Sequence, residues 1–429
     1  MKDKMKKKLI LWLAAMMAVS TATMTTSCSG EDNTDNPAVV PEPVVPAARI
    51  TETIRKEEAK ATVYNFEYPS VDPYGKAVTL SGSIIVGDEV EAGKHAAGML
   101  LYNHFTAFQK DQCPSRGDLG VALKVVGSQL IAVAPDYYGF GSTGDKDQAY
   151  CMSRVNSQGS VDALLAARQL LKEKGYTWGD YLFNLGYSEG GQTAMGVVRL
   201  VAEKYPDIKI THTVAGAGPY DIGETYRQLV SSGETSMPST VISTLLAYNE
   251  FYQMGVNNSE MLLEPTLSNI PVYLLSKDYK RIELEGELAP TKIAEWLSLT
   301  LLDFNTPLSL RFMEVFEKDN LTKGWKPRGD ERISLVHNRL DACVPYANTT
   351  QMSEFFKKAG LTVDIAITSN RYEDGKVFVF PVILPALSKK VGSHEVGAIP
   401  FVTELVTVIC HYLDIKPWFT ITAEELESA

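Results

Sequence analysis

The stretch Leu185-Gly186-Tyr187-Ser188-Glu189-Gly190-Gly191 is the most informative part of this chain. It has the pattern Gly-x-Ser-x-Gly, follows an apolar run over 181–185 and precedes apolar residues at helical spacing over 194–201. Between a strand and a helix, such a tight turn holds its serine hydroxyl out at the top of a sheet. The glycines relieve crowding around the strained serine. We therefore predict that Ser188 is a nucleophile, against the alternative of a purely structural turn, and that the Glu189 N–H points at the same place.

The segments around this turn alternate between strand and helix patterns. Continuous apolar runs of the kind found in strands buried on both faces occur at 96–102 and 129–134. Further strands are expected at 208–215, 333–337 and 361–367, and helices at 118–126, 160–174, 189–204, 347–358 and 399–413. This alternation predicts an α/β fold with a mostly parallel sheet and helices on both faces. Residues 60–70 and 76–87 are predicted to be an antiparallel pair at the sheet edge.

The alternation stops between the strand at 208–215 and the strand at 333–337. Leucine-rich helical segments are expected there at 239–254, 291–302 and 308–318, with few strand signals. We predict a helical insertion over 220–330, which divides the core of the fold into a first part, 51–219, and a second part, 331–429.

A serine nucleophile needs a base within hydrogen-bond reach and an acid that orients the base. In folds with this turn, the chain order is Ser, then Asp or Glu, then His. His394 follows a glycine in a loop and is the predicted base, whereas His411 lies in an apolar helix and fits a packed core histidine better. Asp341, in the loop after the strand at 333–337, is the predicted acid, against a helix-capping role. Asp364 and Asp374 remain alternatives.

A second backbone donor for a developing oxyanion is expected in the loop after the strand at 96–102. This loop is Asn103-His104-Phe105-Thr106, and the N–H of Phe105 or Thr106 is the candidate. His104 either shapes the pocket or caps the strand.

The N-terminal segment predicts export. Residues 1–27 combine a lysine-rich start with an apolar run, Leu9 to Val19, that is too short to span a bilayer, as in a secretory signal peptide. Cys28 after a small residue resembles a bacterial lipoprotein processing site, which implies a lipid on Cys28. The proline-rich segment 28–50 is expected to be an extended tether. We therefore predict an outer-membrane lipoprotein that faces the periplasm or the cell surface and is anchored rather than membrane-spanning.

Charge and cysteine content exclude some classes of protein. The chain has 41 Lys and Arg against 52 Asp and Glu; without residues 1–27, which hold five Lys and one Asp, the formal net charge is −15. Such a chain has no general affinity for nucleic acid. The cysteine spacing fits no zinc site. Cys113 and Cys151 lie in turn-rich loops of an exported protein, so a disulfide between them is plausible, while Cys343 and Cys410 are expected to be buried thiols.

Together these pieces resemble the α/β-hydrolase superfamily, in particular secreted lipases and esterases. The matching segments are His104-Phe105, the run from Pro135 to Gly141, the Ser188 turn, Asp341-x-x-Val344-Pro345 and His394. The resemblance implies cleavage of carboxylic esters through an acyl-enzyme on Ser188, with no metal and no cofactor. It also implies that the insertion is a lid over the site.

Two other functions stay open at this stage. One is a serine peptidase of the prolyl-peptidase type, in which Glu283, Glu285 and Glu287 would bind an amino terminus. The other is a surface lipoprotein that binds glycans without catalysis, against which the complete set of Ser188, Asp341 and His394 argues.

Overall fold

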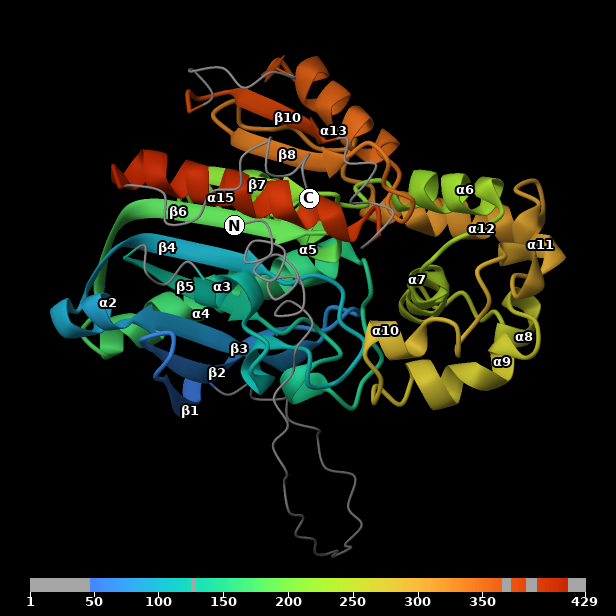
Figure 1. Ribbon diagram of the computed structural model, residues 1–429, viewed down its shortest axis with the longest axis horizontal. Helices are drawn as coiled ribbons and strands as arrows, with labels where there is room; N and C mark the ends of the chain where they lie inside the picture. Colours follow the sequence, from blue (N-terminus) through green and yellow to red (C-terminus); the bar gives the residue numbers. More distant parts are fainter. Residues whose placement is uncertain (1–46, 125–128, 365–371, 383–391, 416–429) are drawn as a thin grey trace, which may run out of the picture.

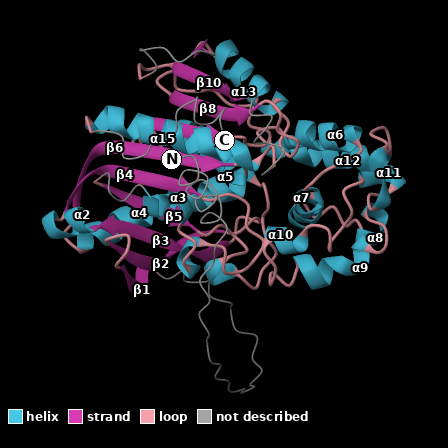
Figure 2. Ribbon diagram, in the orientation of Figure 1, coloured by secondary structure: helices cyan, strands magenta, loops and turns pink. Residues whose placement is uncertain are grey.

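A computed structural model describes residues 47–124, 129–364, 372–382 and 392–415. They form one twisted sheet with helices on both faces and a helical group at one end (Figures 1 and 2). In chain order the strands are β1 (Arg49–Lys56), β2 (Ala61–Val71), β3 (Ala77–Gly87), β4 (His95–Asn103), β5 (Leu130–Pro135), β6 (Thr177–Tyr187), β7 (His212–Gly216), β8 (Arg332–Asn338), β9 (Thr362–Asp364) and β10 (Lys376–Val382). The spatial order is β1-β2-β3-β5-β4-β6-β7-β8-β10-β9.

The sheet is antiparallel at one edge and parallel elsewhere. β1, β2, β3 and β5 pair antiparallel, whereas every pair from β5 and β4 through to β10 and β9 is parallel. The mostly parallel α/β fold is confirmed. The strands β4, β5, β7 and β8 are almost wholly buried, and β6 is buried from Leu182 to Tyr187. The continuous apolar runs of β4 and β5 predict this burial.

Helices cover both faces of the sheet. The longer ones are α4 (Ser153–Glu173), α5 (Glu189–Lys204), α13 (Ala347–Lys358) and α15 (Ala398–Leu413), and the short ones of the core are α2 (Asp88–Gly93) and α3 (Gly120–Lys124). The apolar side chains of α4, α5 and α13 fill the core on one face, and those of α3 and α15 fill it on the other. α15 is apolar enough to pass as a membrane span by composition, but it packs against β6, β7 and β8 as a core helix.

The chain between β7 and β8 is helical, as predicted. It contains α6 (Ile222–Ser232), α7 (Pro238–Phe251), α8 (Asn258–Met261), α9 (Thr266–Asn269), α10 (Arg281–Leu284), α11 (Leu299–Leu302) and α12 (Pro307–Phe316). These helices gather at one end of the sheet, on the right in Figure 1. The helix expected over 291–302 is instead two short pieces, a 3-10 turn at 293–295 and α11. The buried Trp296 and Leu297 separate the two pieces.

Several expectations need correction. β1 was not predicted, and it places Arg49 and Ile50 in the sheet rather than in the tether, so that β1, not β2, forms the edge. β10 was also not predicted. His411 is exposed on α15 and stacks on the ring of Tyr372, with ring centroids 3.4 Å apart, so it is not a core histidine.

The predicted disulfide is absent as well. Cys113 and Cys151 are both free and buried. Cys113 packs with Ala107 and Phe140, whereas Cys151 belongs to the large core around α4. Because the two thiols lie in different apolar clusters, they are separate buried thiols. Cys343 and Cys410 are buried, as expected. The predicted signal peptide and Cys28 lie outside the described residues, as does nearly all of the tether.

Candidate active site

Ser188 lies on a strained turn between the end of β6 and the start of α5. Its backbone has φ 59° and ψ −123°, a conformation that residues other than glycine rarely adopt. Its N–H donates to the carbonyl of Gly216 on β7 at 2.8 Å. A Cβ at Gly190 would lie 2.2 Å from the carbonyl oxygen of Asn103, so only glycine lets α5 approach β4 this closely. The turn is thus held from both neighbouring strands.

Asp341 lies in the loop that follows β8 and is buried. Its Oδ1 accepts the backbone N–H groups of Cys343 at 2.8 Å and Val344 at 2.9 Å. These two bonds fix the plane of the carboxylate and leave Oδ2 to face His394. Asp341 does not cap a helix: α13 begins at Ala347, and its N-cap residue, Tyr346, makes no side-chain cap.

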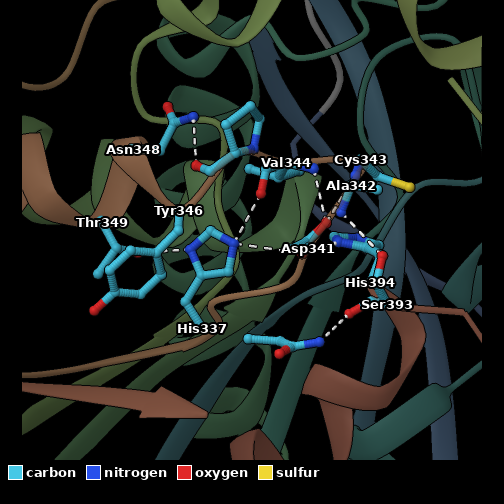
Figure 3. Close-up of polar contacts among 12 residues, drawn as sticks. His337, Asp341, Ala342, Cys343, Val344, Tyr346, Asn348, Thr349, Ser393 and His394 are labelled. Atoms are coloured by element: carbon cyan, nitrogen blue, oxygen red, sulfur yellow. Dashed lines mark hydrogen bonds and ion pairs between the residues drawn. The ribbon is translucent and has the colours of Figure 1, made fainter. Parts of the chain in front are cut away.

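His394 meets Asp341 directly (Figure 3). Nδ1 of His394 lies 2.7 Å from Oδ2 of Asp341, and both side chains are buried. The loop that carries His394 is held by the Tyr187 hydroxyl, which donates to the His394 carbonyl at 2.5 Å, and by Asn338 Nδ2, which donates to the Ser393 carbonyl at 2.6 Å. With Nδ1 on the carboxylate, the ring of His394 is fixed in orientation, and it lines the same cavities as Ser188.

The pair has complementary electrostatics. Burial works to raise the pKa of Asp341, but the charge of His394 and hydrogen bonds from His337 and His394 outweigh it and hold that pKa well below its usual range. Burial works to lower the pKa of His394, but the Asp341 carboxylate outweighs it and raises that pKa above 6.5. Asp341 is therefore charged at neutral pH, ready to stabilise an imidazolium.

The two alternative acids lie elsewhere. Asp374 pairs with Arg332, Oδ1 to Nη2 at 2.5 Å, and Asp364 ends β9, the outermost strand. Asp341 is thus the acid that faces His394.

The candidate oxyanion donors surround Ser188. Glu189 is the first residue of α5, so its N–H has no acceptor within the helix. Phe105 and Thr106 line the same cavity as Ser188. His104 is buried under this loop: its Nε2 lies 3.1 Å from the Asp136 carbonyl oxygen, and its ring stacks on Tyr137. His104 therefore supports the loop and does not line the cavity.

Two cavities meet at Ser188 and His394. The larger one, about 130 Å³, opens past Phe105 and Thr106 and is lined on its outer side by Lys280, Arg281 and Ile282 of the insertion. The smaller one, about 50 Å³, runs between α6 and α7. Apolar residues dominate its lining: Tyr150, Pro219, Ile222, Tyr226, Leu229, Met237, Val241 and Val344. Met237 lines both cavities.

Sequence reasoning missed two contacts around the pair. Arg281 of the insertion makes an ion pair with Glu395, the residue after His394, with Nη2 and Oε1 2.7 Å apart. His337, at the end of β8, also contacts Asp341. His337 and Asp341 lie four residues apart in the sequence, but the sequence pattern indicates only that His337 ends a strand. Among the residues that the structure describes, no three His, Cys, Asp or Glu side chains are grouped so as to hold a metal ion.

The fold is that of α/β-hydrolase esterases and lipases. The sequence profile of the secretory lipase family matches residues 122–277, which include Ser188. No curated protein matches the chain. The rice cell wall degrading esterase LipA of Xanthomonas oryzae is 18% identical with a TM-score of 0.69, covering 86% of this chain and 98% of LipA. Lipase A of Candida antarctica in its closed state is 13% identical with a TM-score of 0.63, covering 90% and 88%. The family match on this fold supports a carboxylic ester hydrolase, and the family's secretory character agrees with export.

Proposed function

We propose that this protein is a serine esterase in which Ser188, His394 and Asp341 are the catalytic triad. The observation that carries the proposal is that Ser188, on its strained turn, and His394 line the same two cavities, while His394 is paired behind them with the buried Asp341. Strain at a serine between glycines is expected where the hydroxyl must be presented to a substrate. The family match on the segment around Ser188 supports the same reaction.

The reaction proceeds by acyl transfer. Ser188 attacks the ester carbonyl while His394 takes its proton, and Asp341 stabilises the imidazolium. The N–H of Glu189, with that of Phe105 or Thr106, stabilises the oxyanion; the loss of one such donor typically costs about 10²–10³ in kcat. His394 then protonates the leaving alcohol, and water releases the acyl group from Ser188.

The smaller cavity favours short acyl groups. Its volume is about 50 Å³, against about 130 Å³ for the larger cavity, and helices α6 and α7 enclose it. The larger cavity then receives the alcohol portion. Because LipA is described as degrading rice cell wall, acetylated polysaccharides belong among the substrates to test.

The peptidase alternative receives no support from the insertion. Glu283 accepts the N–H of Lys280 at the start of α10, and Glu285 is hydrogen-bonded to Ser239 on α7. Neither carboxylate, nor that of Glu287, lines the two cavities at Ser188. The three glutamates therefore do not form a binding site for an amino terminus there.

The test is hydrolysis of p-nitrophenyl esters of increasing acyl length by the wild type and by Ser188→Ala. We expect the highest kcat/KM at acyl chains of two to four carbons, about 10³-fold or more loss in Ser188→Ala, and release of acetate from acetylated xylan. Hydrolysis that survives in Ser188→Ala would contradict the role of Ser188, and a preference for long chains would contradict the assigned acyl cavity.

We further propose that the insertion 220–330 is a lid and that a lipid on Cys28 anchors the enzyme to the outer membrane. The contact of Arg281 with Glu395 supports the lid, because it ties α10 to the loop of His394. For the anchor, we expect the wild type, but not Cys28→Ala, to incorporate an alkyne-labelled fatty acid and to fractionate with membranes. Equal labelling of both proteins would contradict lipidation at Cys28.

A further inference from the structure

His337 is a second buried histidine on the candidate catalytic acid. It is the residue before the last of β8, and its side chain is fully buried. Its Nε2 lies 3.3 Å from Oδ2 of Asp341, the same oxygen that meets His394 Nδ1 at 2.7 Å. Figure 3 shows the two imidazoles on either side of the carboxylate.

The partners of His337 assign its proton. Nε2 lies 2.9 Å from the carbonyl oxygen of Val344 and 3.3 Å from Asp341 Oδ2. Both oxygens can only accept, so Nε2 must carry the hydrogen and share it between them. Nδ1 lies 2.8 Å from the hydroxyl of Thr349, which donates to it when the ring is neutral.

His337 therefore ties the two ends of the acid loop to β8. Its Nε2–H reaches Val344, whose own N–H binds the other oxygen of Asp341 at 2.9 Å. Oδ1 of Asp341 then accepts from the N–H groups of Cys343 and Val344, and Oδ2 lies between His394 Nδ1 at 2.7 Å and His337 Nε2 at 3.3 Å. A carboxylate held at both oxygens cannot rotate away from His394.

We propose that His337 is a positioning residue for catalysis, which holds Asp341 Oδ2 toward His394 through its Nε2–H. This inference rests on the proposed function. It differs from a packing role, because the hydrogen on Nε2, rather than the volume of the ring, would carry the effect.

The test compares His337→Gln with His337→Met. The side-chain amide of glutamine places an N–H close to the position of Nε2, whereas methionine fills similar space without a donor. We expect His337→Met to lose about 10–100-fold in kcat with little change in KM. The acid limb of its pH profile should move to lower pH, because Asp341, no longer held toward His394, raises the pKa of His394 less. His337→Gln is expected to stay within about fivefold of wild type with the limb unmoved.

Equal losses in both variants with unmoved pH profiles, or wild-type activity in His337→Met, would overturn the proposal. The wild type and Ser188→Ala are run in the same assay, so a failure of the esterase function is seen separately, as activity that is absent or independent of Ser188. Should His337→Met not fold, ¹⁵N NMR of histidine-labelled wild type decides: we expect His337 protonated at Nε2, and protonation at Nδ1 alone would overturn the proposal.

Discussion

Replacing Glu189 with glutamine is expected to stabilise the protein near neutral pH and to leave catalysis intact. The Glu189 side chain points away from Ser188 into the core, where its Oε1 accepts the N–H of Cys151 at 3.1 Å and the amide of Asn156 at 3.3 Å. No hydrogen-bond partner of Oε2 is found among the described residues. Burial raises the pKa of Glu189 from 4.5 to about 8, and the two hydrogen bonds oppose it only in part.

The magnitude follows from linkage. Between pH 4.5 and about 8 the folded state holds a proton on Glu189 that the unfolded state has released. Stability therefore falls as pH rises through this window. At about 1.36 kcal/mol per pKa unit, the cost is about 1 kcal/mol at pH 5 and about 3 kcal/mol at pH 7. Glutamine does not titrate, so Glu189→Gln should gain these amounts relative to wild type.

The assay is urea unfolding of wild type and Glu189→Gln at pH 5 and pH 7. Glu203→Gln, at an exposed position of the same helix, is the matched control and should change stability by less than about 1 kcal/mol at either pH. Ester hydrolysis by Glu189→Gln should stay within about threefold of wild type, because the oxyanion donor is the backbone N–H. A gain that does not grow with pH, or a loss at pH 7, would refute the reasoning.

Three further predictions concern the site. Catalysis needs neutral His394, and Asp341 raises the pKa of His394 above 6.5. The kcat/KM of the wild type should therefore fall as the pH drops through that pKa. In Asp341→Asn this fall should occur at lower pH, and kcat should be about 10⁴-fold lower. Gly190→Ala should lower the melting temperature by more than 10 °C or prevent folding, because its Cβ would lie 2.2 Å from a backbone oxygen. Gly93→Ala, which has open space around the new Cβ, should keep the wild-type melting temperature. Equal melting temperatures of the two variants would refute this. Leu229→Ala enlarges the smaller cavity alone and should raise the ratio of octanoate to butyrate hydrolysis more than fivefold, and an unchanged ratio would place the acyl group elsewhere.

The central sheet and the turn at Ser188 could be predicted because their signals are local. β4 and β5 are continuous apolar runs, and the turn combines glycines with a strand before it and a helix after it. β1 could not be predicted in this way. It pairs only with β2, and its charged side chains are exposed, so no apolar pattern marks it. β10 could not be predicted because it contains Pro381, and proline is a signal against a central strand. In the structure Pro381 lies one residue before the end of β10.

The candidate site was predictable in its chain order but not in its surroundings. Ser188, Asp341 and His394 follow from motif and order, whereas the choice of Asp341 over Asp364 needed the position of β9 at the far edge. The cavities depend on side chains of the insertion, such as Met237, which pack across long sequence separations. The contact of His337 with Asp341 could not be predicted from the sequence, because it depends on the path of the loop after β8.

The most direct test of the account is active-site labelling of the folded protein with a fluorophosphonate, followed by peptide mass mapping. A fluorophosphonate reacts with a serine that a neighbouring base has activated. We predict one adduct per chain, on Ser188, which is lost in Ser188→Ala, strongly slowed in His394→Gln and prevented by a short-chain ester substrate. Folded wild-type protein that remains unlabelled, or an adduct at another residue, would contradict the assignment of Ser188 as the nucleophile.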